Sequence, residues 1–134
     1  METPFKSTFD ISNVSADVKS YIYQTILEFE PYTTPETVVA VIAKDPLKLI
    51  SQLEADGLDY DRVELKKMYR ISISISEDGA KIEEEGLAED IYDAIRIAKD
   101  KLVKVLSEIQ DNVISNQDRT IQINTILQHS GTIH

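Results

Sequence analysis

Apolar and polar residues alternate without interruption along residues 69–76. Tyrosine and isoleucine occupy every second position, while Arg70 and three serines lie between them. Alternation with a period of two is typical of a β-strand that has one buried face and one face in water. We therefore predict a strand over this segment, with its serine side exposed to solvent.

Two earlier segments also have strand patterns. Residues 5–11 alternate in the same way, and residues 37–43 form a short uncharged run rich in β-branched residues. The first pattern predicts a half-buried strand, and the second predicts a strand buried on both faces.

A fourth strand is expected after Asp78-Gly79, a pair that favours a type I′ hairpin turn. A two-residue turn places Ile82 opposite Ile75 on the apolar face. The same pairing places Glu84 on that apolar face, which conflicts with the pattern. One resolution is that the strand leaves the sheet early.

Helical spacing of apolar residues appears twice. Residues 18–29 form one amphipathic segment, preceded by Ser15 as a candidate N-cap and followed by two prolines. Residues 91–113 form a longer apolar stripe, with Asp90 as the candidate N-cap. Both segments are predicted to be helices.

Two parts of the chain lie outside this repeating pattern. Asp45 and Pro46 open a predicted short helix that runs to about Ala55, and an acidic loop follows it. After Ile114 the chain becomes polar, and residues 114–134 are expected to be a flexible tail or a marginal extra strand.

The predicted order of elements is β-α-β, a short inserted helix, then β-β-α. It indicates an α+β two-layer domain, in which a four-stranded sheet carries two amphipathic helices on one face. We expect this domain to occupy residues 1–113, with an insert at about residues 45–67, and residues 114–134 to form the tail.

Composition limits the possible functions. The 134 residues are 42% hydrophobic, which suffices for a core, and no cysteine is present for disulfides, thiol catalysis or zinc-thiolate sites. We find no signal peptide and no apolar run long enough to cross a bilayer, so we expect a cytoplasmic protein without a membrane partner.

Charge argues against phosphate-rich partners at first sight. The chain has 24 acidic and 14 basic residues, a net charge of −10, which would repel nucleic acid and anionic lipid. However, the acidic excess lies in residues 1–90, whereas residues 91–113 carry four basic and four acidic side chains. The total therefore does not exclude a local phosphate-binding site on the last helix.

The passage from the hairpin into the last helix resembles a known family. After the Asp78-Gly79 turn, the helix begins with Asp90-Ile91-Tyr92-Asp93-Ala94-Ile95, and Lys101-Leu102 follows. This sequence and the order of elements resemble the ribosome hibernation-promoting factor and ribosome-associated inhibitor family, also called sigma-factor modulation proteins. The resemblance covers about residues 5–113, except for residues 45–67, where family members usually have a shorter connection.

The resemblance implies a function. Members of this family bind the small ribosomal subunit and repress translation, or promote ribosome hibernation, under stress. Basic residues of their helices and sheet contact rRNA. The corresponding rRNA-binding candidates in this chain are two cations on the hairpin strands and four on the last helix: Arg70, Lys81, Arg96, Lys99, Lys101 and Lys104.

An ordinary structural role for these cations is an open alternative. They could form a solvated helix face with intrahelical ion pairs such as Asp100–Lys104. The protein would then be a diverged copy of the fold that binds a basic protein through its acidic face, insert or tail.

Catalytic and metal sites are not expected. His129 and His134 have no third ligand in view, the acidic loop at residues 56–61 lacks the order of a Ca²⁺ loop, and residues 83–85 lack a partner histidine or nucleophile. We therefore predict a non-enzymatic protein without cofactor, metal or small-molecule substrate.

Overall fold

The computed structural model describes the backbone of residues 3–130 and the side chains of residues 3–112. The chain forms two compact units, Met1–Val103 and Lys104–His134. The first unit contains a sheet with its covering helices, and the second unit continues the last helix.

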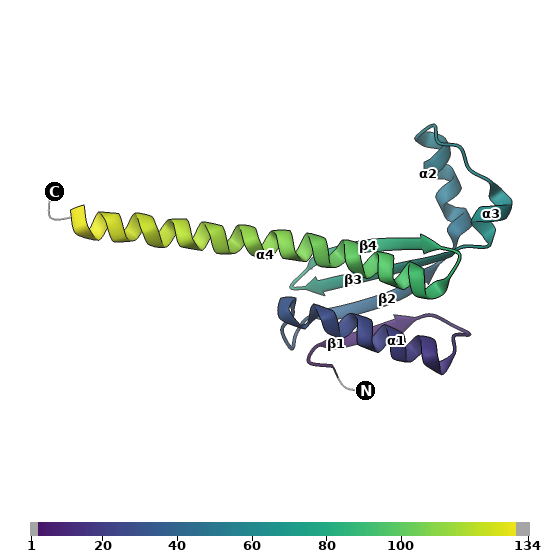
Figure 1. Cartoon of the computed structure of the whole chain (residues 1–134), viewed down its shortest axis with the longest axis horizontal. Helices are drawn as coiled ribbons and strands as arrows, with labels where there is room; N and C mark the ends of the chain where they lie inside the picture. The colour runs from purple at the N-terminus through teal and green to yellow at the C-terminus, as the bar shows by residue number, and fades with distance from the viewer. Residues whose placement is uncertain (1–2, 131–134) are drawn as a thin grey trace. The chain divides into compact units, whose positions relative to one another are not determined.

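A four-stranded mixed sheet organises the first unit (Figure 1). The spatial order of the strands follows the sequence, with β1 parallel to β2 and the other two pairs antiparallel. The strands are β1 (Lys6–Asp10), β2 (Val38–Lys44), β3 (Tyr69–Glu77) and β4 (Ala80–Ala88). All four predicted strands are thus present, and the α+β fold class is confirmed.

Two long helices begin at the predicted caps. Helix α1 (Ala16–Ile26) starts after Ser15, whose hydroxyl accepts a hydrogen bond from the Val18 amide at 3.2 Å. The last predicted turn is the 3₁₀ helix η1 (Leu27–Tyr32), not α-helix. Helix α4 (Ile91–Ser130) starts after Asp90, whose carboxylate accepts from the Tyr92 amide at 2.7 Å.

Both helices cover the same face of the sheet (Figure 1). On α1, the Tyr23 ring packs edge-on against Phe9 of β1, with 4.9 Å between ring centroids. On α4, the backbone at Ala94 lies directly against Gly86 of β4. The face between these contacts forms the core, where β2, β3 and the helices bury aliphatic side chains: Ile22, Ile26, Val39, Val41, Ile71, Ile73, Ile95 and Leu102.

The hairpin has the predicted turn and register. Asp78 and Gly79 both have positive φ, 52° and 81°, as a type I′ turn requires. Ile82 pairs with Ile75, which confirms the predicted alignment.

The expectation that β4 leaves the sheet early is wrong. Glu84 pairs with Ile73 on the helix-covered face, and the strand continues to Ala88. Glycine at position 86 lets α4 approach this part of the strand closely, since a Cβ there would lie 1.9 Å from the Ala94 carbonyl oxygen. Glu84 itself is half-buried.

Two predictions about burial are also wrong. Strand β2 is not buried on both faces, because only Val39 and Val41 among its residues are buried. Conversely, the serine face of β3 is not exposed to solvent, because Ser72 and Ser74 are 0% and 3% exposed. These side chains are short and belong to the inner strand β3, and the ion pairs of Lys44 on β2 with Glu83 and Glu85 on β4 join the two neighbouring strands across it.

The insert joins the end of β2 to the start of β3. The predicted short helix is present as the 3₁₀ helix η2 (Pro46–Leu49) followed by α2 (Ile50–Ala55). Asp45 caps it as predicted, accepting from the Leu47 amide at 2.9 Å. One element was not predicted, the short helix α3 (Arg62–Lys66), which Asp61 caps.

The second unit differs from expectation in one respect. The backbone of residues 114–130 continues α4, so the extra strand considered for this segment is wrong. The division into a domain of residues 1–113 and a flexible tail of residues 114–134 stays a prediction. Residues 131–134 lie outside the described part of the chain.

Candidate nucleic-acid interface

The six cations proposed to contact rRNA do not form one cluster. Arg70 and Lys81 belong to β3 and β4 and lie on the open face of the sheet, opposite the helices. Arg96, Lys99 and Lys101 lie on α4 within the first unit, and Lys104 begins the second unit. The structure therefore places two of the candidates on the sheet and four on α4.

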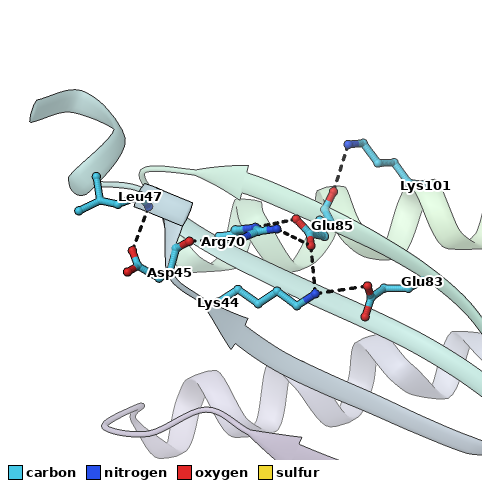
Figure 2. A network of polar contacts seen from close by, with 7 residues as sticks. All are labelled: Lys44, Asp45, Leu47, Arg70, Glu83, Glu85 and Lys101. Atoms are coloured by element: carbon cyan, nitrogen blue, oxygen red, sulfur yellow. Dashed lines mark hydrogen bonds and ion pairs between the residues drawn. The ribbon is translucent and has the colours of Figure 1, made fainter. Parts of the chain in front are cut away.

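Arg70 is held by Glu85 of the neighbouring strand (Figure 2). Its Nε and Nη2 atoms donate to the two carboxylate oxygens at 2.7 and 3.0 Å, a bidentate pair. Its Nη1 atom donates to the Asp45 main-chain oxygen at 3.3 Å. With only 15% of its side chain exposed, Arg70 ties the root of the insert to the sheet.

Lys44, which was not among the predicted candidates, completes the network on the open face. Its ammonium lies 3.3 Å from a Glu83 oxygen and 3.2 Å from a Glu85 oxygen (Figure 2). Lys81 adds a longer ion pair to Glu83 at 3.6 Å. The hairpin register was a usable signal, since pairing Ile82 with Ile75 puts both glutamates on the face that carries Arg70.

The pKa of each glutamate is lowered by its polar neighbours. The pKa of Glu83 is lowered by the adjacent Ser72 hydroxyl and by Lys44, which outweigh the effect of burial. The Ser72 hydroxyl is buried beside this carboxylate and favours its charged form. It nevertheless makes no well-formed hydrogen bond with any described residue. For Glu85, burial favours the neutral form most strongly, but hydrogen bonds from Arg70 and Lys44 together lower the pKa.

Lys99 is also bound by carboxylates. Its ammonium lies 2.7 Å from Asp100 on the same helix and 3.3 Å from Glu28 of η1. The hydrogen bond to Asp100 is the main reason that its pKa is raised. Because its side chain is only 16% exposed, Lys99 joins α4 to η1.

Arg96 is more accessible. Its guanidinium lies 3.6 Å from Asp93 and 3.6 Å from Asp100, and half of its side chain is exposed. Asp100 thus binds Arg96 and Lys99, where the sequence analysis suggested a pair with Lys104.

Lys101 and Lys104 are both exposed. The Lys101 ammonium donates to the Glu85 main-chain oxygen at 3.0 Å, at the free edge of β4 (Figure 2). A carbonyl is neutral, so this contact does not compensate the charge of Lys101. Lys101 is accordingly well suited to bind an anion.

The arrangement separates structural cations from accessible ones. Arg70 and Lys99 are largely buried in ion pairs, and a phosphate would have to displace a carboxylate to reach them. The accessible candidates are Lys81, Arg96, Lys101 and Lys104.

Other chemistry finds little support in the described residues. A cavity of about 360 Å³ lies beside the start of α1, but its lining is uncharged, with apolar side chains such as Ile11, Val18 and Ile71. Among the described residues no group of histidine and acidic side chains is placed to hold a metal, and no described helix is long and apolar enough to cross a membrane. The histidines considered as ligands lie beyond the residues with described side chains.

Comparison with known proteins identifies the fold. No family profile and no curated sequence matches this chain. The crystal structure of the Protein Y N-terminal domain from Thermus thermophilus matches with a TM-score of 0.53 and 16% identity, over 81% of this chain and 99% of that one. A ribosomal subunit interface protein from Coxiella burnetii matches with a TM-score of 0.52 and 11% identity, over 80% of this chain and 97% of that one. The resemblance to the hibernation-promoting factor family is thus confirmed for the fold.

Proposed function

We propose that this protein associates with the ribosome, binds the small subunit, and represses translation or promotes hibernation under stress. The observation that carries the proposal is the fold match. Nearly the whole length of a Protein Y domain and of a ribosomal subunit interface protein is reproduced, at 99% and 97% coverage. Since a fold alone does not determine function, the contacts must be tested directly.

The proposed rRNA contacts are the four accessible cations, not all six candidates. Lys81, Arg96, Lys101 and Lys104 present charges to solvent. Phosphate contacts of this kind supply most of the non-specific affinity for nucleic acid, through release of counterions. Arg70 and Lys99 instead hold the fold together, so they support the interface without touching RNA.

Co-sedimentation with purified ribosomes tests the proposal. We expect the full chain to pellet with ribosomes at low salt and to be released at high salt. Separated subunits should show retention by the small subunit. A chain found only in the free fraction at low salt would contradict ribosome association, and retention by the large subunit alone would contradict the small-subunit assignment.

A further inference from the structure

The insert exposes three large apolar side chains within six residues. Leu58, Tyr60 and Val63 are 56%, 37% and 63% exposed. They occupy the connection after α2 and the first turn of α3, so none belongs to the sheet. They lie close together in the sequence, and apolar side chains that gather on a surface mark interaction sites more often than scattered ones do.

Acidic side chains outnumber basic ones in the same stretch of the chain. Between positions 54 and 63 the chain carries four carboxylates and a single cation, and all of them are exposed: Glu54, Asp56, Asp59, Asp61 and Arg62. This charge repels phosphates, so nucleic acid does not fit the surface. A second copy of the chain would bring the same negative charge against itself. Charge complementarity favours a basic protein segment that carries an apolar side chain.

The surface is held in place before any partner binds. Asp61 accepts hydrogen bonds from the Val63 and Glu64 amides at 2.9 and 3.3 Å. The Tyr60 hydroxyl donates to a Glu54 carboxylate oxygen at 2.6 Å. Leu65, at the other end of α3, is buried and anchors the helix. A surface ordered in this way loses little entropy on binding.

We propose that the insert is a second contact surface, with which Leu58, Tyr60 and Val63 bind a basic segment of a ribosomal protein. This proposal rests on the ribosome association proposed above and adds a protein contact to the rRNA contacts. The rRNA contacts come from cations outside the insert, so the two can be disrupted separately.

Carbodiimide cross-linking on purified ribosomes tests this contact, because the reagent joins carboxylates to nearby lysine amines. We expect mass spectrometry to identify links from Asp56 or Asp59 to lysines of a ribosomal protein. In the double variant Leu58→Ser/Val63→Ser, the yield of these links should fall roughly tenfold, as truncating central apolar contacts does. Both substituted residues are exposed, so the fold should persist.

Leu27→Ser is the matched control, since Leu27 is an exposed leucine outside the insert, on η1. It should leave the yield unchanged. If the wild-type chain pellets but its links map elsewhere, or the double variant links as well as wild type, the insert contact is refuted while ribosome association stands. If the wild-type chain does not pellet, both proposals fail.

Discussion

Glu85 is the residue through which most of the polar network passes. Its carboxylate accepts from Arg70 of β3 and from Lys44 of β2, and its main-chain oxygen accepts from Lys101 of α4 (Figure 2). One residue on the edge strand therefore links three other elements. The same contacts neutralise two cations that would otherwise attract phosphate.

Replacing Glu85 with glutamine should change how stability depends on pH. The pKa of Glu85 is lower in the folded protein than its ordinary value, so the ionised form stabilises the fold above about pH 4.3. This contribution is lost as the pH falls through the lowered pKa. Urea unfolding at pH 7 should show a loss of about 1–2 kcal/mol for Glu85→Gln, and a smaller loss at pH 3.

Glu84→Gln is the control for this measurement, because it removes a carboxylate from the opposite face of the same strand. Its effect at pH 7 should be smaller than that of Glu85→Gln. Equal losses of stability for the two variants would contradict a specific contribution of the Glu85 network to the free energy of unfolding. So would a loss for Glu85→Gln that does not become smaller at pH 3.

Gly86→Ala should destabilise the protein through a steric clash. The added Cβ would meet the Ala94 carbonyl oxygen at 1.9 Å and the Ala98 amide nitrogen at 2.8 Å, so α4 must move away from β4. We expect a loss at the upper end of about 1–3 kcal/mol by thermal or urea unfolding, because the clash is with backbone atoms that cannot rotate away.

Gly57→Ala provides the comparison for this substitution. Gly57 has a φ of +68° but open space around it, so alanine there should cost only about 1 kcal/mol of backbone strain. A Gly86→Ala variant as stable as Gly57→Ala would mean that the helix does not pack so closely on the strand.

At the scale of elements, features that depend on a few adjacent residues were predicted correctly. Features that depend on contacts between distant parts of the chain were not. The hairpin register followed from Asp78-Gly79, and both long helices start at the caps read from Ser15 and Asp90. The burial of Ser72 could not be predicted, because it depends on which strands lie on either side of β3. Helix α3 was missed because five residues are too few to show helical periodicity.

The candidate site was predicted less well than the fold for the same reason. A sequence identifies cations, but whether each one is free depends on partners distant in the chain. Lys99 illustrates this, since its second carboxylate comes from Glu28, 71 positions earlier. Arg70 is likewise bound to a glutamate of the next strand.

The Asp90 cap allows a test of how α4 is held at its start. Its carboxylate accepts from the Tyr92 and Asp93 amides, so Asp90→Ala leaves both without this partner. Urea unfolding should show a loss of about 1 kcal/mol, whereas Asp90→Ser, which can still cap, should stay close to wild type. Equal losses for alanine and serine would indicate that capping contributes little.

At the scale of the whole molecule, a net charge of −10 leaves only a few accessible candidate cations, one on β4 and three on α4: Lys81, Arg96, Lys101 and Lys104. Lys44, Arg70 and Lys99 are paired with carboxylates, so these three cations are not available to bind phosphate. Within the insert, residues 54–61 carry four carboxylates and no cation. The proposed ribosome binding should therefore depend on few cations and be weak at high salt.

The salt dependence of ribosome binding measures how many cations contact phosphate. If Lys81, Arg96, Lys101 and Lys104 each neutralise one phosphate, the slope of log K against log salt should not exceed about 3.6 in magnitude, at roughly 0.9 per contact. Lys101→Ala should lower the magnitude by about 0.9. Lys6→Ala should leave the slope unchanged, because that exposed lysine lies on β1 and pairs with Glu36. If none of the four substitutions changes the slope, these cations do not touch phosphate, and the affinity for the ribosome must come from protein contacts such as those proposed for the insert.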